Sequence, residues 1–422
     1  MVYQSKYNLI VVGGGLTGAA AAVAAARKGL SVLLIERDGC LGGAMANGLV
    51  YPFMKYWLKQ EEETERCYLS RGLFAEMRKR LQAYAPTDND QYFNTEFFKI
   101  LLDDMTTEAG VTLLFHATVI ETVKDARRVN AVRVATKSGI LQLACDYIID
   151  ASGDGDVMAL AGCEFQLGRD ADGFCQPMTN CFRVANVDVK AFLAEKPHLQ
   201  ELWRAAQQTG EITNPRENIL VFTGIGEGIL HFNTTRVVKH NPTNAFEVSE
   251  AEVMARRQIA ELMAFLKKHS PACKNAVLIS SAWHIGVRES RKLRGVHILT
   301  AEELKTRVHF EDTIAIANYS IDIHSPTGTG TELYYFKPGE YYEIPYRALL
   351  PREYDNLLVA GRCISATHEA QSAIRIMPIC ANMGEAAGLA AAQACQKAIR
   401  THDIDIKALQ NDLRENGAVL EL

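Results

Sequence analysis

The sequence predicts an α/β protein: a Rossmann-like dinucleotide-binding domain, built on a parallel sheet plus a β-meander, with an inserted α+β domain. First, the chain opens with a strand, a glycine-rich turn and an alanine-rich helix, as a nucleotide-binding βαβ unit does. Second, its pattern changes after residue 161 to short strands mixed with helix. Third, a buried-strand pattern and a small-residue helix return after residue 340. We therefore expect the dinucleotide-binding domain at 1–161 and 341–422, and a substrate domain at 162–340.

Composition and charge argue against several classes of protein. The chain has 422 residues, enough for two or three core-forming regions, and its net charge of −5 argues against a nucleic-acid or anionic-membrane surface. No apolar run is long enough to span a bilayer, and the first residues do not resemble a signal peptide. Its ten cysteines include no CxxC pair, which is typical of reduced thiols. We expect a cytoplasmic protein.

The first 36 residues carry the clearest sign of a ligand. An apolar strand runs into Gly-Gly-Gly-Leu-Thr-Gly, and a helix follows at once. Gly13 permits a tight turn, Gly15 lets the backbone approach a pyrophosphate, and Gly18 lets the helix sit close to the sheet. The helix N-terminus attracts phosphate, and Glu36, at the end of the second strand, can bind ribose hydroxyls. This pattern predicts a dinucleotide site; a glycine-rich turn without a ligand is the alternative.

The next segments predict a loop, two helices and a meander. Residues 37–54 contain four glycines and form either a loop around the dinucleotide or a plain surface loop. Helices are predicted at 70–84 and from 94 or 95 to 109. Strands then follow from 111, and the last returns to the parallel sheet through 147–150. Three acids in the turn after it suggest a metal loop, but the full EF-hand spacing is missing, so we expect no metal.

The region from 162 to 340 predicts strands at 179–185 and 229–238 and one long helix, opened by the capping box Ser249-x-x-Glu252. A second capping box, Thr300-x-x-Glu303, predicts a shorter helix. Residues 356–361 then repeat the pattern of a buried strand ending in glycine. The helix predicted at 381–399 has small residues on one face, and its N-terminus is expected to cap the cofactor.

Nearly the whole chain carries motifs that are more specific than a glycine-rich loop. They are VVGGGLTG with the later Glu-Arg and LGG, NTTRV at 233–237, GVRESRKLRG at 286–295, DIH at 322–324, EIPYRALLP at 343–351, and the C-terminal GRCISATHEAQSAIRIMP and GEAAGLAAA. Together they resemble a bacterial family of FAD-dependent oxidoreductases in the glutathione-reductase-like superfamily, on its fumarate-reductase-like side. The resemblance implies FAD as the cofactor.

The resemblance also implies which residues hold FAD. Val119 would offer its backbone to the adenine, and Met383 and Gly384, at the N-terminus of the last helix, would face the flavin pyrimidine. The full set is Gly13, Gly15, Leu16, Thr17, Gly18, Glu36, Arg37, Gly42, Gly43, Val119, Ala151, Gly153, Asp154, Gly361, Arg362, Met383 and Gly384. Because Cys40 has no cysteine partner nearby and 37–56 contain no histidine, we expect neither a redox disulfide nor a histidyl–flavin bond there. A dedicated NAD(P)H domain is not expected either.

In a flavoenzyme the flavin carries the redox step, while protein groups position the substrate and move protons. His324 is the first candidate acid or base, with a structural turn histidine as the alternative. His368 is expected on a loop near the isoalloxazine, facing the substrate or only flanking the flavin. Arg288 and Arg291, expected on one side of a turn or helix, could clamp an anion or form an ion-pair lattice with neighbouring acids. Arg375 could bind a substrate carboxylate.

We therefore expect an enzyme, an FAD-dependent oxidoreductase that moves a hydride between the flavin and a small-molecule substrate. A sugar-derived molecule or a hydroxy acid is the substrate class that such families suggest. Two alternatives stay open. One is a flavin-bearing electron-transfer subunit with a redox partner, although this chain has no cysteine cluster for iron–sulfur. The other is a non-catalytic flavin sensor.

Overall fold

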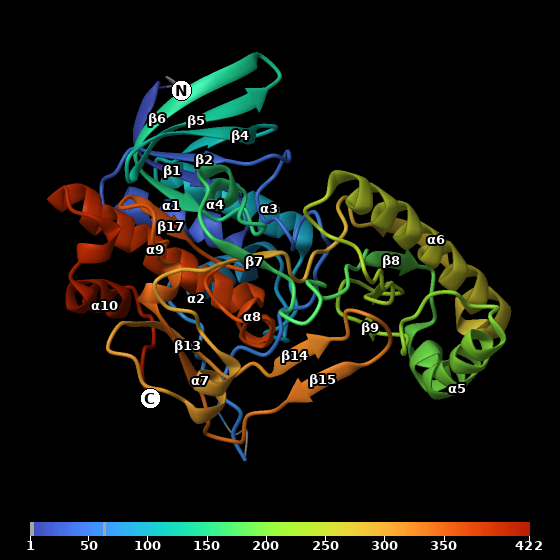
Figure 1. The fold of residues 1–422 in the computed structure, drawn as a ribbon. Coiled ribbons are helices and arrows are strands. Elements are labelled where there is room, and N and C mark those ends of the chain that lie inside the picture. Colours follow the sequence, from blue (N-terminus) through green and yellow to red (C-terminus); the bar gives the residue numbers. More distant parts are fainter. Residues whose placement is uncertain (1–3, 62–64) are drawn as a thin grey trace.

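The computed structural model describes residues 4–61 and 65–422. Its main sheet has seven strands in the order β3-β2-β1-β6-β5-β4, with β17 also paired to β6 (Figure 1). The strands are β1 (Lys6–Val12), β2 (Val32–Ile35), β3 (Thr112–Leu114), β4 (Thr118–Asp125), β5 (Arg128–Thr136), β6 (Gly139–Asp150) and β17 (Leu357–Val359). This sheet confirms the α/β class predicted from the sequence.

Strand β6 belongs to two parts of the sheet. Its first half pairs antiparallel with β5 in the β4–β5–β6 meander, as predicted. Its second half runs parallel to β1 on one side and to β17 on the other. The carboxyl ends of β1, β2, β6 and β17 therefore meet at one edge of the sheet, which is where open α/β sheets bind ligands.

Helices cover this sheet, and the closest pair is α1 against α9. They are α1 (Leu16–Arg27), α2 (Leu73–Tyr84), α3 (Thr95–Glu108), α4 (Asp156–Ala161), α9 (Met377–Lys397) and α10 (Ile406–Glu415). A Cβ atom at Gly384 would lie 2.1 Å from the carbonyl oxygen of Thr17, and one at Gly388 would lie 2.2 Å from that of Ala21. Only glycine permits this backbone contact.

The prediction for the start of α9 was wrong. The helix begins at Met377, and Pro378 lies in its first turn, a position where proline is tolerated because its missing N–H has no intrahelical partner. Met383 and Gly384 therefore lie inside the helix rather than at its N-terminus. Helix α10 follows, so α9 is not the last helix either.

A second, four-stranded sheet has the order β11-β8-β10-β9. Two long helices accompany it, and Figure 1 shows them on the side remote from the main sheet. The elements are β8 (Phe182–Ala185), β9 (Val221–Phe222), β10 (Leu230–Phe232), β11 (Val277–Ser281), α5 (Val189–Thr209) and α6 (Ala245–His269). The sequence interpretation missed α5, which contains Pro197, and overestimated the lengths of β8 and β10.

The two capping-box predictions had different outcomes. Helix α6 begins earlier than predicted, because the side chain of Asn244 accepts hydrogen bonds from the N–H groups of Phe246 and Glu247. Ser249 lies within the helix, where its hydroxyl donates to the carbonyl oxygen of Ala245 at 2.7 Å. The box at Thr300 is confirmed, and it opens helix α7 (Ala301–Thr306).

The remaining elements belong to neither of these two sheets. They are β7 (Phe165–Leu167), β12 (Arg291–Leu293), β13 (Thr313–Ala317), β14 (Ile321–His324), β15 (Thr331–Tyr334), β16 (Tyr342–Pro345), α8 (His368–Ile374) and the 3₁₀ turns Pro271–Cys273, Tyr346–Leu349 and Thr401–Asp403. The molecule has two lobes, the first built on the main sheet and the second on the four-stranded sheet with α5 and α6, and the hairpin β14–β15 lies between them (Figure 1). Core residues of β13 and α7 pack with those of β1 and α9. The domain boundaries at 161/162 and 340/341 stay a prediction.

Among the described residues, we find no helix that combines the length and apolarity required to cross a membrane.

The α1–α9 contact predicts the effect of adding one methyl group. Replacing Gly388 by alanine should destabilise the protein by about 2–3 kcal/mol, because the new Cβ overlaps the carbonyl oxygen of Ala21. The measurement is the free energy of unfolding in urea. Gly328→Ala is the control, since a Cβ there meets no atom within 4 Å. Equal stability of the two variants would contradict the predicted contact.

A buried histidine in the second sheet gives a pH prediction. His231 is 0% exposed, both of its ring nitrogens lack hydrogen-bond partners among the described residues, and the Tyr51 and Phe222 rings lie beside it. Burial, followed by the charge of Arg183, lowers its pKa from 6.5 to about 3. Between these two pKa values the imidazole is protonated in the unfolded chain but neutral in the folded protein. The free energy of unfolding therefore falls as the pH drops below 6.5.

Replacing His231 by phenylalanine should remove this loss. Between pH 7.5 and 5, the wild type should lose about 2 kcal/mol more stability than His231→Phe. Urea unfolding at the two pH values measures the difference, with His198→Gln as the control because that side chain is 70% exposed. A variant that loses as much stability as the wild type would contradict the burial of a neutral His231.

Candidate flavin and substrate site

The turn after β1 has the geometry of a phosphate-binding loop. Gly13 has φ +100°, and a Cβ there would lie 2.4 Å from the carbonyl oxygen of Ala151. Gly18 is equally constrained, since its Cβ would meet the carbonyl oxygen of Gly13 at 1.8 Å. No side chain caps α1 at Gly15, so the N–H groups of its first turn, at Leu16 and Thr17, face outward without a side-chain acceptor. This is the N-terminus that a phosphate group needs.

Gly15 differs from the other two glycines of the motif. Its φ of −64° suits any residue, and a Cβ there would have only the Cα of Gly43, at 4.0 Å, within contact range. The protein's own packing therefore does not require glycine at this position. Close approach of a ligand is the remaining physical reason for it, and this observation fits a dinucleotide pyrophosphate.

The loop after β2 closes over the same turn. The N–H of Gly42 donates to the carbonyl oxygen of Gly14 at 2.8 Å, and a Cβ at Gly43 would lie 2.9 Å from the Cα of Gly15. Glu36 is 5% exposed, and its carboxylate accepts from the N–H groups of Gly14 and Asp38 at 2.5 and 2.9 Å. Burial raises its pKa. Residues 37–54 contain no helix or strand, as predicted.

The adenosine end of the predicted site has less regular surroundings. Arg37, with a half-exposed side chain, lines a cavity of about 430 Å³ together with His116 and Trp283. Val119 lies on β4, paired with Val134. After β6, the carboxylate of Asp150 accepts from the N–H groups of Ser152 and Met158, so this acid organises the turn around Ala151 and Gly153.

Arg362 and Arg291 both bind the turn that follows β6. The guanidinium of Arg362 donates to the Asp154 carboxylate at 2.7 Å, and that of Arg291 donates to the Asp156 carboxylate at 3.0 Å. Gly361 has φ +87°, and its Cβ would lie 2.6 Å from the Thr17 hydroxyl oxygen. The C-terminal segment thus contacts the first turn of α1. That Gly361 and Arg362 approach the ribityl and pyrophosphate groups stays a prediction. Arg291 lies here and does not share a face with Arg288.

The hairpin β14–β15 supplies the polar groups of the second half of the site. Asp322 and His324 lie two residues apart on β14 and therefore point to the same face of the strand. His324 Nε2 is 3.4 Å from the Asp322 carboxylate, and the Tyr319 hydroxyl donates to that carboxylate at 3.0 Å. Arg375, at the end of α8, is 3.5 Å from it. Helix α9 begins two residues later, without a side-chain cap.

Burial and charge set the protonation of these groups. Burial lowers the pKa of His324 to about 3, and the charge of Arg288 acts in the same direction. Although burial alone would raise the pKa of the Asp322 carboxyl, its contacts with His324 and Arg375 hold that pKa below its usual value. At neutral pH, therefore, His324 is neutral and Asp322 is ionised.

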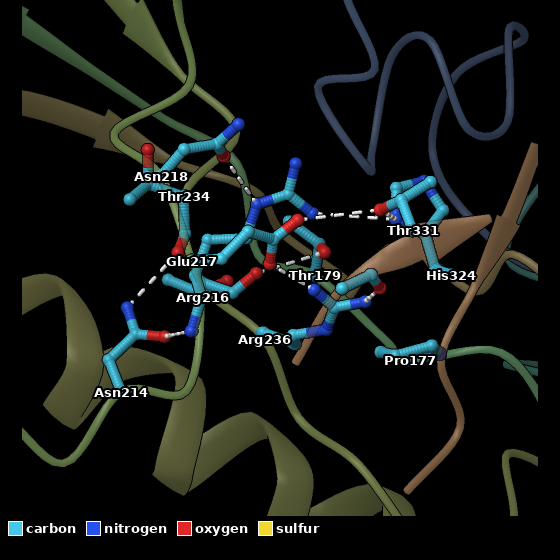
Figure 2. A network of polar contacts seen from close by, with 12 residues as sticks. Pro177, Thr179, Asn214, Arg216, Glu217, Asn218, Thr234, Arg236, His324 and Thr331 are labelled. Carbon is cyan, nitrogen blue, oxygen red and sulfur yellow. Dashed lines mark hydrogen bonds and ion pairs between the residues drawn. The ribbon is translucent and has the colours of Figure 1, made fainter. Parts of the chain in front are cut away.

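His324 also contacts the second lobe (Figure 2). Its Nδ1 lies 3.1 Å from the Thr331 hydroxyl and 3.5 Å from the guanidinium of Arg216. The Thr331 hydroxyl donates to Glu217 at 3.4 Å, and Arg236 forms an ion pair with Glu217. The Asp-Ile-His run pointed to His324. Arg216, Thr331 and Glu217 were missed, because no motif marks them and Arg216 reaches His324 only through a contact between residues 108 apart in the chain.

Arg288 extends from the same cluster toward the loop before β8. Its guanidinium donates to the carbonyl oxygen of Pro177 at 2.7 Å, to the Thr179 hydroxyl at 2.5 Å and to the amide oxygen of Asn233 at 3.3 Å. All three acceptors are neutral. Burial and then the charges of Arg375 and Arg216 lower the pKa of Arg288 to about 9.

His368 is the first residue of α8 and does not lie on a loop, contrary to the prediction from the sequence. Its Nδ1 is 2.7 Å from the carboxylate of Glu289, which also accepts from Lys292 at 2.5 Å and from the N–H of Gln176 at 2.9 Å. The side chains of His368, Glu289 and Lys292 are buried. The prediction of a lattice of Arg288 and Arg291 with Glu289 was wrong, because Glu289 pairs with Lys292 and contacts the ring of His368 instead.

Comparison with known proteins agrees with this geometry. The family model of FAD dependent oxidoreductases matches residues 8–413. None of the curated proteins matches the chain.

Several solved structures are similar to most of the chain. A geranylgeranyl bacteriochlorophyll reductase-like protein from Thermoplasma acidophilum has 16% identity and a TM-score of 0.44, covering 97% of this chain and 83% of its own. The anhydrotetracycline hydroxylase OxyS from Streptomyces rimosus has 15% identity and a TM-score of 0.47, covering 97% and 66%. A myxobacterial FAD-dependent chondrochloren halogenase has 16% identity and a TM-score of 0.44, covering 97% and 79%. Similarity at this level carries neither substrate nor reaction over to this chain.

The glycine turn and the C-terminal segment that meets it fit FAD, and the family model spans almost the whole sequence. The chain belongs to the FAD-dependent oxidoreductase family.

Proposed function

We propose that this enzyme transfers a hydride between FAD and a small polar substrate held at the β14–α8 cluster. The observation that carries the proposal is that Asp322, His324 and Arg375 converge just before the uncapped N-terminus of α9. A helix N-terminus of this kind stabilises negative charge on a neighbouring group. When FAD is bound, it supplies the acceptor or donor of the hydride.

The side chains of the cluster then have separate tasks. In the oxidative direction, neutral His324 accepts the proton of a substrate hydroxyl, and ionised Asp322, 3.4 Å from Nε2, stabilises the resulting imidazolium. The Tyr319 hydroxyl holds the carboxylate of Asp322 in place. Reduction of a carbonyl uses the same groups in reverse. Sugar-derived molecules and hydroxy acids both offer a hydroxyl-bearing carbon for this reaction.

Three finer points belong to the same proposal. The cofactor residues of the sequence analysis would hold FAD, with the first turn of α9 in the role first expected of Met383 and Gly384. The family's placement on the fumarate-reductase-like side of the glutathione-reductase-like superfamily rests on sequence motifs. A cytoplasmic location agrees with ten cysteines that are all free of disulfides.

The open space beside Gly15 predicts a separation between folding and cofactor binding. Gly15→Ala should weaken FAD binding at least about tenfold, because a methyl group there enters the space expected for phosphate, while the cofactor-free protein keeps its thermal stability. Gly13→Ala should instead destabilise the cofactor-free protein, since its Cβ overlaps Ala151. Thermal unfolding and FAD titration measure both effects. Unchanged FAD affinity in Gly15→Ala would refute this role for Gly15.

The role of His324 predicts a loss of rate without a loss of cofactor. His324→Gln should bind FAD normally but slow anaerobic reduction of the flavin about 100-fold or more, because proton abstraction is lost. The substrates are a panel of sugars and hydroxy acids, and flavin absorbance reports the reduction. The control is His198→Gln on the exposed face of α5. Equal rates in wild type and His324→Gln would remove His324 from the mechanism, and no reduction by any panel member would refute the proposed reaction.

A further inference from the structure

The cluster around His324 contains more positive than negative side chains. Four guanidiniums belong to it, those of Arg216, Arg236, Arg288 and Arg375, and its two carboxylates are those of Asp322 and Glu217. Glu217 is paired with Arg236, and Asp322 with Arg375. The two remaining guanidiniums, those of Arg216 and Arg288, form no ion pair among the described residues, so four cations face two carboxylates.

Arg216 is the more buried of these two unpaired cations. It is 4% exposed, and its hydrogen-bond partners are two neutral groups, the Asn218 amide oxygen at 3.0 Å and the His324 ring at 3.5 Å. The carboxylate that most favours its charged form is that of Glu217, which is already paired with Arg236. Figure 2 shows it between these two residues. Among the described residues, no carboxylate forms an ion pair with Arg216 or with Arg288. A buried charge without a partner is costly, so proteins normally pair it.

The pKa values of Arg216 and Arg288 agree with a missing anion. Burial lowers the pKa of Arg216 and of Arg288, which means that their charged forms are poorly compensated. In addition, the Nε of Arg375 is buried and has no hydrogen-bond partner among the described residues. A bound oxyanion would satisfy these donors and compensate the charge.

We propose that the substrate carries a carboxylate, which binds to the guanidiniums of Arg216 and Arg288. This inference rests on the proposed hydride transfer and narrows its substrate from small polar molecules to hydroxy acids and oxo acids. The planar guanidinium matches a carboxylate through paired N–H···O bonds. Because Arg216 touches His324, a carboxylate on Arg216 brings the adjacent carbon, with its hydroxyl, toward the imidazole. A 2-hydroxy acid has this spacing, whereas a neutral sugar leaves both guanidiniums unpaired.

Binding to the oxidised, FAD-loaded protein tests the proposal without turnover. The probes are glycolate, lactate, malate and tartrate, compared with glycerol, methyl glucoside and glycerol 3-phosphate at equal ionic strength. Perturbation of flavin absorbance and the shift in thermal midpoint report binding. We expect the wild type to respond to at least one 2-hydroxy acid and to bind it at least about tenfold more tightly than the neutral probes, a difference of about 1.4 kcal/mol.

Two variants and a control assign the effect to the unpaired arginines. Arg216→Gln keeps a hydrogen-bonding group but removes the charge, and it should weaken hydroxy-acid binding at least about tenfold. Arg288→Lys keeps the charge but loses the planar guanidinium and its paired N–H donors, so it should also weaken hydroxy-acid binding. It tests the proposal independently if Arg216→Gln fails to fold. The control is Arg256→Gln, because Arg256 lies on exposed α6 and is paired with Glu252. This variant should bind like the wild type.

Several results would overturn the carboxylate assignment. They are equal responses to neutral probes, tighter binding of glycerol 3-phosphate, no response to any hydroxy acid, and wild-type affinity in both site variants. Failure of carboxylate binding can be distinguished from failure of the proposed hydride transfer. Flavin reduction by a neutral sugar without carboxylate binding would refute only this inference. Carboxylate binding lost in Arg216→Gln, without any flavin reduction, would refute only the proposed reaction.

Discussion

The backbone contact between α1 and α9 determines how the rest of the site is assembled. It joins the helix that follows the phosphate turn to a helix more than 350 residues later in the chain. The contact needs glycine at 384 and 388, because the carbonyl oxygens of Thr17 and Ala21 occupy the space of a side chain. Gly361 meets Thr17 from the same C-terminal segment. The contact thereby fixes α9 against the helix that follows the glycine turn.

The substrate half of the site depends on a different constraint, the compensation of buried charge. The second lobe contributes Arg216, and the hairpin β14–β15 contributes His324, so the cluster forms only where the lobes meet. Its cations exceed its anions, in contrast to the lattice at Glu289, where Lys292 and His368 surround a single carboxylate. In the Glu289 lattice the carboxylate is paired with a buried lysine, which suits a structural role. The His324 cluster lacks an anion and suits a ligand.

Local sequence patterns predicted the parts of the fold that depend on local physics. The strand–glycine–helix opening, the meander and the Thr300 capping box follow from residue spacing alone. The start of α6 did not, because Asn244 and Ser249 are both good caps and only tertiary packing distinguishes them. The site shows the same limit. His324 was found through its motif, but the contact with Arg216 joins residues 108 apart, and no pattern of nearby residues encodes it.

The central claim is that segments from both ends of the chain enclose one flavin nucleotide. Hydrogen–deuterium exchange with and without FAD tests it most directly, because it reports on each segment separately. The account predicts that FAD slows exchange in two regions together, the phosphate turn at 13–18 and the start of α9 at 376–380. Protection of the first region alone, or a folded protein that takes up no FAD, would contradict the account.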